Sequence, residues 1–179
     1  MLLDPDRAVL MLIDLQDSLV PAMHTSEREL DNVSRLLTGA ETLGVPVVAT
    51  EQNPDRLGGT VASLDLRKHC TPVPKQDFDA SRNADVCAAL SGLNRGQVVL
   101  AGLEAHVCVL QTAAGLLNYE AEVFVVADAV MSRRPENRTL ALRRLSQAGA
   151  QIVGTEMVLF EWLGRADTPA FRTLLPVIK

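Results

Sequence analysis

Short, uninterrupted apolar runs alternate with longer amphipathic stretches along the chain, and this alternation constrains the fold more than any other feature. The runs contain no regular apolar–polar alternation, which is typical of strands buried on both faces of a parallel sheet. The stretches between them repeat apolar residues at helical spacing. The sequence therefore predicts an α/β fold, a three-layer, Rossmann-like, doubly wound sheet with helices on both faces. The runs that predict strands are residues 8–13, 45–50, 97–101, 122–127 and 151–153.

The amphipathic stretches predict helices whose ends carry residues that start or stop a helix. Gly44 stops the first helix, Pro135 begins the fourth, and Thr155 and Thr168 can cap the last two. Segment 71–74 contains two prolines, so it predicts a weak strand at the sheet edge. We therefore expect about six mostly parallel strands. The predicted helices are residues 26–43, 83–90, 106–118, 135–148, 155–163 and 168–175.

Length and composition limit the number of domains and the kinds of partner. A chain of 179 residues has the size of one domain, so we expect a single domain over residues 1–179. A net charge of −5, no basic run and only 3% aromatic residues disfavour nucleic-acid binding. No apolar run approaches the ~20 residues that cross a bilayer, so no membrane partner is expected. Three cysteines without paired spacing favour a reducing compartment, and we expect a cytoplasmic protein.

Three reactive side chains follow predicted strands, at the edge where open α/β sheets bind ligands. Asp14 follows the first strand, Lys75 the proline-rich third, and Cys108 lies early in the helix after the fourth. Asp14 can take the thiol proton, Lys75 can stabilise both anions, and a helix N-terminus favours a thiolate. Backbone N–H groups around Glu104 and Cys108 can bind an oxyanion. Each residue also has a plain reading as a capping residue, a solvated charge or a small buried side chain, because spacing alone does not prove that they meet.

Other residues are weaker candidates for function. Cys70 and Cys87 are expected to pack structurally. The histidines have no metal-ligand spacing and no nucleotide-binding motif follows a strand, so neither a metal nor a cofactor is expected. Leu159, Phe160 and Trp162 on a late helix are candidates either for a subunit interface or for the core. Candidate pocket residues near the strand ends are Gln16, Glu51, Gln52, Phe78 and His106.

Several motifs resemble the isochorismatase-like cysteine hydrolases, the superfamily of nicotinamidase and N-carbamoylsarcosine amidase. The order Asp-x-Gln after the first strand, Lys after the third and Gly-Leu-Glu-Ala-His-Val-Cys after the fourth is similar to that of this family. The isochorismatase domain-containing subgroup is the most similar part of it. The resemblance extends over nearly the whole chain, with further similar segments at residues 51–54, 57–58, 102–112, 126–129, 155–156 and 159–161.

The resemblance implies a role for each of the three side chains. It implies Asp14 as general base, Lys75 as its electrostatic partner and Cys108 as nucleophile in the hydrolysis of a small amide or carbamoyl C–N bond through a thioester. It also implies a cis peptide bond between Leu103 and Glu104, which turns the Glu104 N–H toward the oxyanion together with that of Cys108. The implied protein is a homo-oligomer, a dimer or larger, that acts on a small molecule. The alternative is a catalytically silent binding or scaffold protein with the same fold.

Two departures from the family argue against the substrates of its two best-known activities. Nicotinamidases carry an Asp and histidines after the second strand that hold a metal beside the substrate ring, whereas residues 51–56 contain no histidine. Isochorismatases proper hydrolyse a vinyl ether and lack the nucleophilic cysteine, which this chain has at Cys108. Neither substrate transfers to this chain, so the resemblance leaves the substrate open.

Overall fold

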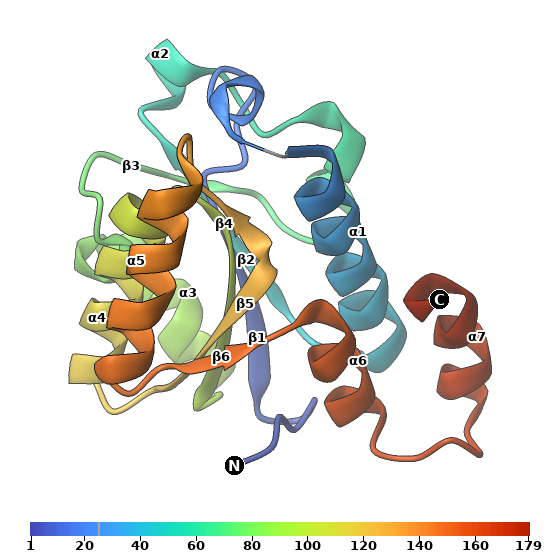
Figure 1. The fold of residues 1–179 in the computed structure, drawn as a ribbon. Helices are drawn as coiled ribbons and strands as arrows, with labels where there is room; N and C mark the ends of the chain where they lie inside the picture. Colours follow the sequence, from blue (N-terminus) through green and yellow to red (C-terminus); the bar gives the residue numbers. More distant parts are fainter. Residues whose placement is uncertain (25) are drawn as a thin grey trace.

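The computed structural model describes residues 1–24 and 26–179, which form three layers with a parallel sheet in the middle (Figure 1). The six-stranded sheet has the order β3-β2-β1-β4-β5-β6, and each neighbouring pair is parallel. The strand order reverses between β1 and β4, so this is the doubly wound, Rossmann-like sheet that the sequence predicts. The strands are β1 (Ala8–Ile13), β2 (Val47–Gln52), β3 (Val73–Lys75), β4 (Gln97–Leu103), β5 (Glu122–Met131) and β6 (Gln151–Val153).

Helices cover both faces of the sheet. In Figure 1, α1 and α6 lie on one face with α7 packed outside them, and α3, α4 and α5 lie on the other face. Among the described residues, no helix combines the length and the apolar composition needed to cross a bilayer. The helices are α1 (Ser26–Leu43), α2 (Pro54–Leu57), α3 (Ala84–Leu93), α4 (Leu110–Asn118), α5 (Pro135–Gln147), α6 (Thr155–Leu163) and α7 (Pro169–Ile178).

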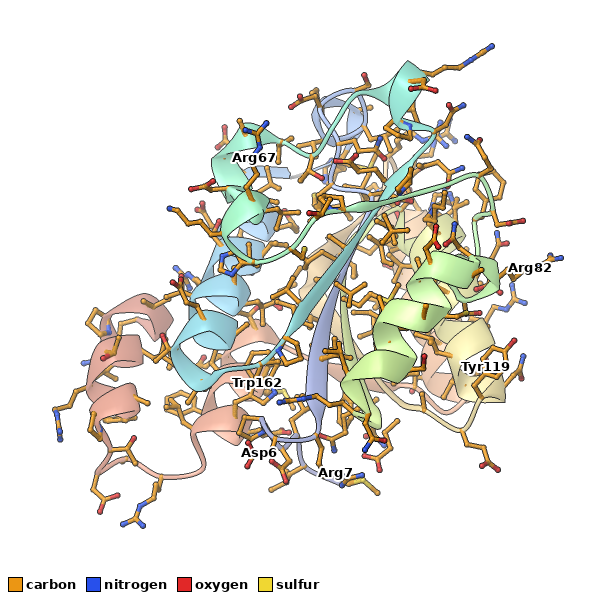
Figure 2. The ribbon with its side chains drawn as sticks, turned by 180° about the vertical axis from the view of Figure 1, so that it is seen from behind. Asp6, Arg7, Arg67, Arg82, Tyr119 and Trp162 are labelled. Carbon is orange, nitrogen blue, oxygen red and sulfur yellow. The ribbon has the colours of Figure 1, made fainter. Side chains whose placement is uncertain are left out.

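Two apolar cores lie on opposite sides of the sheet. Successive strand residues point to opposite faces, so Leu10 and Leu12 of β1 join the core under α1 and α6, whereas Val9 and Met11 join the core under α3, α4 and α5. Both cores draw on one strand, which is why the sequence shows it as a continuous apolar run. Figure 2 shows side chains filling the space on both sides of the sheet.

The late helix α6 contributes mainly to the core. Leu159 and Trp162 are buried in the core under α1, while Phe160 between them in sequence is 42% exposed. The sequence left open whether this segment forms a subunit interface or part of the core, and the structure places Leu159 and Trp162 in the core. Gly39 of α1 permits the close approach of α6, because a Cβ at this position would lie 2.3 Å from a methyl carbon of Leu159.

Several element boundaries differ from the prediction for physical reasons. β2 begins at Val47 rather than at residue 45, because Pro46 has no N–H to donate to the ladder. β5 continues to Met131 beyond the predicted end at residue 127, since it pairs again with β4 after a register shift. The helix predicted from residue 106 starts as a π-helical segment, Ala105–Val109, that leads into α4. The proline-rich β3 lies at the sheet edge, as predicted.

Gly102 of β4 allows close contact with the end of β1. Its φ is +120°, and a Cβ there would lie 2.1 Å from the carbonyl oxygen of Ile13. A Gly102→Ala variant is expected to lose about 3 kcal/mol of unfolding free energy, because backbone strain and collision add. Urea denaturation measures this loss. Gly149→Ala is the matched control, since Gly149 has φ +104° but nothing within 4 Å. Equal losses of unfolding free energy in the two variants would contradict a collision between the new Cβ and the Ile13 carbonyl.

Candidate active site

Three side chains predicted from strand ends meet at the carboxyl edge of the sheet. Asp14 follows β1, Lys75 ends β3, and Cys108 lies in the π-helical segment after β4. The Nζ atom of Lys75 lies 2.7 Å from Oδ2 of Asp14, and both side chains lie close enough to the Cys108 thiol to act on its pKa. The meeting point lies beside the β1–β4 reversal of strand order, where doubly wound sheets bind ligands.

Asp14 and Lys75 form a buried ion pair, with side-chain exposures of 1% and 0%. Oδ1 of Asp14 accepts a hydrogen bond of 2.7 Å from the Thr50 hydroxyl, while Oδ2 accepts from Lys75. Lys75 also donates to Oε1 of Gln52 at 2.6 Å and to the Asp77 carbonyl at 3.3 Å. Buried charges need a partner and further hydrogen bonds, so this network stabilises both charges and fixes the direction of the carboxylate.

The backbone turns sharply where Asp14 leaves β1. Asp14 has φ +52°, in the left-handed region that Asp tolerates better than most residues. Its N–H donates to the Thr50 carbonyl, and its own carbonyl accepts from the N–H of Gln16. The turn therefore directs the Asp14 side chain away from the ladder and toward Lys75.

Gln16 ties the ends of two strands together. It is fully buried, and its amide nitrogen donates to the carbonyls of Gln52 and Gly58 at 2.9 and 2.7 Å. Its amide oxygen accepts from the N–H of Gln52 at 2.7 Å. These bonds occupy both amide hydrogens, so Gln16 holds Gln52 against Lys75 rather than offering its amide to a pocket.

The Cys108 thiol is protonated at neutral pH. Burial is the main cause that raises the pKa of Cys108 to about 12, followed by the charge of Asp14 and by its hydrogen bond, while Lys75 acts in the opposite direction. The helix start alone therefore does not make Cys108 a thiolate, because the side chain is only 7% exposed and lies beside a carboxylate. The thiol proton instead lies next to Asp14, the group that can accept it.

An Asp14→Asn variant is expected to lower the pKa of Cys108, since the carboxylate charge and its hydrogen bond both raise that pKa. Iodoacetamide reacts with the thiolate, whose fraction falls tenfold for each pH unit below the pKa. In a background of Cys70→Ser and Cys87→Ser, alkylation at pH 8, followed by intact mass, is expected to be several-fold faster in the Asp14→Asn chain. Slower alkylation would contradict this electrostatic account.

The backbone around Glu104 is fixed from two sides. The Leu103–Glu104 peptide bond is cis. The Glu104 carboxylate accepts hydrogen bonds from the backbone N–H and the Nε–H of Arg133 at 3.2 and 3.0 Å. The Glu104 carbonyl accepts from the N–H groups of Val107 and Val109. These contacts hold the segment that carries Cys108 in place, which an oxyanion site would require.

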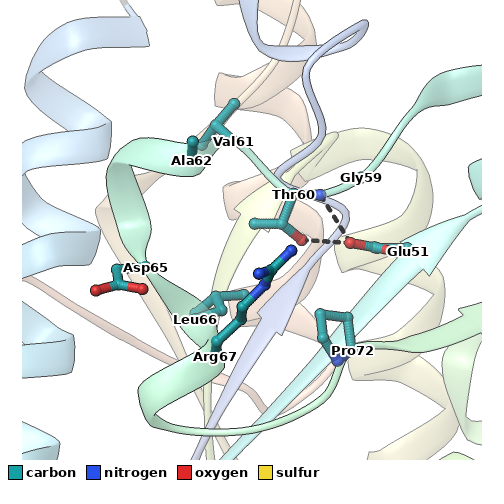
Figure 3. Close-up of a pocket in the computed structure, with 9 residues that line it drawn as sticks. All are labelled: Glu51, Gly59, Thr60, Val61, Ala62, Asp65, Leu66, Arg67 and Pro72. Atoms are coloured by element: carbon teal, nitrogen blue, oxygen red, sulfur yellow. Dashed lines mark hydrogen bonds between the residues drawn. The ribbon is translucent and has the colours of Figure 1, made fainter.

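The remaining pocket candidates have contacts elsewhere than with the triad, the three side chains Asp14, Lys75 and Cys108. Phe78 is 52% exposed and lines a cavity of about 260 Å³ at the surface. The ring nitrogens of His106 lie 3.0 Å from the Ser132 hydroxyl and 3.2 Å from the Asn137 amide, which ties the ring to the β5–α5 connection. Glu51 lines a different cavity, shown in Figure 3. Within residues 1–24 and 26–179, no group of three or more His, Cys, Asp and Glu side chains is placed to hold a metal.

Sequence reasoning missed Thr50, which directs the Asp14 carboxylate. Its signal was present, because Thr50 is the polar residue that ends the apolar run 45–50. Of the predicted pocket residues, the structure places Gln52 in direct contact with Lys75. Gln52 therefore joins Thr50 as a partner of the ion pair.

Comparisons with known proteins identify relatives over the whole chain. The family model described as isochorismatase domain matches residues 8–157. Isochorismatase domain-containing protein 1 from Danio rerio is 36% identical over 99% of this chain, but the chain spans only 62% of that protein. The secreted isochorismatase effector Isc1 from Phytophthora sojae is 32% identical, with 98% of this chain and 86% of that protein covered.

Solved structures share the fold. The MAR1 ribonuclease from Caenorhabditis elegans has a TM-score of 0.91 at 31% identity, over 99% of this chain and 92% of that one. YcaC from Escherichia coli, an octameric hydrolase of unknown specificity, has a TM-score of 0.92 at 26% identity, with coverages of 99% and 90%. YcaC from Pseudomonas aeruginosa, solved with hexane-2,5-diol and covalent acrylamide, has a TM-score of 0.91 at 25% identity, with coverages of 98% and 91%. The domain match and the sequence identities to these relatives show that the chain belongs to the isochorismatase family.

Proposed function

We propose that this chain is a cysteine hydrolase that cleaves a small amide or carbamoyl C–N bond through a covalent thioester. One observation carries the proposal: the Cys108 thiol lies beside a carboxylate, Asp14, that is buried with its cation, Lys75. Such an arrangement supplies a nucleophile, a base and a fixed positive charge in one site with little water.

Acylation begins with proton transfer from the Cys108 thiol to Asp14. The thiolate sulfur attacks the carbonyl carbon, and the carbonyl electron pair moves to the oxygen, which accepts from the N–H groups of Glu104 and Cys108. Once Asp14 holds the proton, its charge no longer opposes the thiolate, while the Lys75 ammonium still stabilises it. Asp14 then gives the proton to the leaving nitrogen, the C–N bond breaks, and an amine and an acyl thioester remain.

Deacylation uses the same groups in the reverse direction. Asp14 takes a proton from a water molecule, whose oxygen attacks the thioester carbonyl. The C–S bond breaks, the acid leaves, and Asp14 returns its proton to the Cys108 sulfur. The cycle consumes one water and one amide and regenerates the protonated thiol, so it needs no cofactor.

Two neighbouring structures support this chemistry. The Pseudomonas aeruginosa neighbour carries covalent acrylamide, an electrophile that attaches to a nucleophile, and the Escherichia coli neighbour is a hydrolase. The Caenorhabditis elegans neighbour is a ribonuclease by name, but a net charge of −5 and 3% aromatic residues disfavour a nucleic-acid substrate for this chain. A silent scaffold is disfavoured because it gains nothing from a buried ion pair beside a thiol.

We also propose that residues 1–179 act as one hydrolase domain in a cytoplasmic homo-oligomer. The octameric Escherichia coli neighbour supports an oligomer, while the Phytophthora sojae relative is secreted by name. Size-exclusion chromatography with light scattering measures the assembly, and fractionation of the native cells measures the location. A monomer at micromolar concentration would contradict the first part.

Intact-mass spectrometry after incubation with a mixed library of small amides tests the activity. The expected result is an adduct on Cys108 whose mass identifies the acyl half of the substrate, with no adduct in a Cys108→Ala chain. A parallel assay supplies single-stranded RNA. RNA cleavage that survives Cys108→Ala would favour the ribonuclease reading, and the absence of adduct and turnover with every amide would overturn the amidase proposal.

A further inference from the structure

A second cavity lies at the sheet edge beneath the chain that connects α2 to β3. Its volume is about 460 Å³, within the usual range of small-molecule sites. Glu51 lines it from β2, and the connecting segment contributes the other walls. Figure 3 shows these side chains around one hollow, with Glu51 on the β2 side and Asp65, Leu66 and Arg67 on the opposite side. The lining residues used in the argument are Glu51, Thr60, Val61, Asp65, Leu66, Arg67 and Pro72.

This cavity is separated from the triad by the sheet. Along β2, successive side chains point to opposite faces, so Thr50 and Gln52 contact the ion pair whereas Glu51 between them faces α1. Leu66 of the cavity belongs to the core under α1, and Cys108 belongs to the core under α3, α4 and α5. A ligand in this cavity therefore does not occupy the position of the substrate.

The cavity carries an oriented carboxylate, Glu51, and the guanidinium of Arg67. It also carries a second carboxylate, Asp65, which is paired with Lys68 and also feels the Arg67 charge. Oε1 of Glu51 accepts the N–H and the hydroxyl of Thr60 at 2.7 and 2.8 Å, which fixes the carboxylate. Figure 3 shows the Arg67 guanidinium pointing from the opposite wall toward Thr60 and Glu51. Among the described residues, none accepts a hydrogen bond from this guanidinium, and none donates to Oε2 of Glu51. Both groups are thus available to a ligand.

We propose that this cavity binds a small zwitterion with an apolar side chain, of the α-amino-acid class. The ligand ammonium pairs with Glu51, and the ligand carboxylate accepts two hydrogen bonds from the Arg67 guanidinium. Its apolar side chain packs on Val61, Leu66 and Pro72. Asp65 already has Lys68 as its partner, so a ligand with only one charge leaves either Glu51 or Arg67 unpaired. The opposed charges of Glu51 and Arg67 therefore favour the zwitterion.

Isothermal titration calorimetry of the full chain tests the proposal with L-leucine, L-methionine and L-phenylalanine as probes. At least one is expected to bind, and its analogues without the amine or without the carboxylate are expected to bind at least about tenfold more weakly, a difference of 1.4 kcal/mol. Arg67→Gln and Glu51→Gln are expected to weaken binding by a similar factor. Arg56→Gln, an exposed arginine outside this cavity, is the matched control and is expected to bind as the native chain does.

Three outcomes would overturn the proposal. The first is no binding of any of the three amino acids at millimolar concentration. The second is equal binding by the single-charge analogues or by the Arg67→Gln chain, whose melting temperature serves as the check on folding. The third is loss of binding after Cys108 is alkylated, because that result would put the ligand at the triad. This test does not depend on whether the chain is an amidase.

Discussion

A Cys108→Ser chain is expected to lose amide hydrolysis by about a thousandfold or more. A serine hydroxyl is a much weaker acid than a thiol, so Asp14 does not generate an effective nucleophile from it. The substitution is nearly isosteric, and the hydroxyl can still hydrogen-bond to Asp14 and Lys75, so unfolding free energy is expected to change by no more than about 1 kcal/mol. Steady-state hydrolysis of the amide found by intact mass measures the first effect, and urea denaturation measures the second.

Cys87 provides the control for this experiment, since its thiol is exposed and the prediction that it packs structurally is wrong. Its sulfur donates to the Ser81 carbonyl at the surface, away from the ion pair. A Cys87→Ser chain is expected to keep full activity and to lose only its own alkylation. Turnover that persists in the Cys108→Ser chain would refute the covalent mechanism, and loss of turnover in both chains would point to a general effect of thiol removal.

A Lys75→Met chain is expected to lose about 3–5 kcal/mol of unfolding free energy. The substitution leaves the Asp14 carboxylate buried without its cation, with the Thr50 hydroxyl as a remaining partner. Alkylation of Cys108 is also expected to slow, because the Lys75 charge lowers the pKa of this thiol in the native chain. Urea denaturation and the rate of iodoacetamide labelling measure the two effects.

The double variant Asp14→Asn, Lys75→Met separates stability from chemistry. It removes both buried charges, and a neutral pair of similar shape often restores the stability that a single removal costs. We expect most of the lost free energy to return while hydrolysis stays absent, since no base remains for Cys108. Equal stability of Lys75→Met and the native chain would refute the buried ion pair as the source of the effect.

The fold was predictable wherever a strand is apolar on both faces. The run 8–13 coincides with β1, because a strand covered on both sides needs apolar residues throughout. The run 151–153 coincides with β6, an edge strand whose Gln151 is exposed. The end of β5 was not predictable in this way. Asp128 interrupts its apolar pattern, and the strand continues because β5 carries extra residues opposite β4: Leu100 pairs with Val125, and Gly102 with Val130. That compensation depends on pairing between distant segments, which local composition does not record.

The sequence predicts which residues of the site follow the ends of strands, but it does not predict which of them contact one another. Lys75 reaches Asp14 across β2, and this meeting depends on the strand order β3-β2-β1, which the sequence pattern alone does not give. The protonation of Cys108 depends on burial and on the Asp14 charge, which exist only after folding. By contrast, the alternation of side chains along β2 was available in the sequence and separates Glu51 from Gln52.

The three-residue edge strand β3 gives the site a thermal limit of its own. β3 pairs only with β2, on one side, and its Pro74 has no N–H, yet it supplies the cation of the triad. Short edge segments with few ladder bonds open at a lower free-energy cost than central strands. Opening of this strand separates Lys75 from Asp14 while β1 and β4 stay paired. On heating, hydrolysis is therefore expected to be lost at a lower temperature than the one at which the two cores unfold.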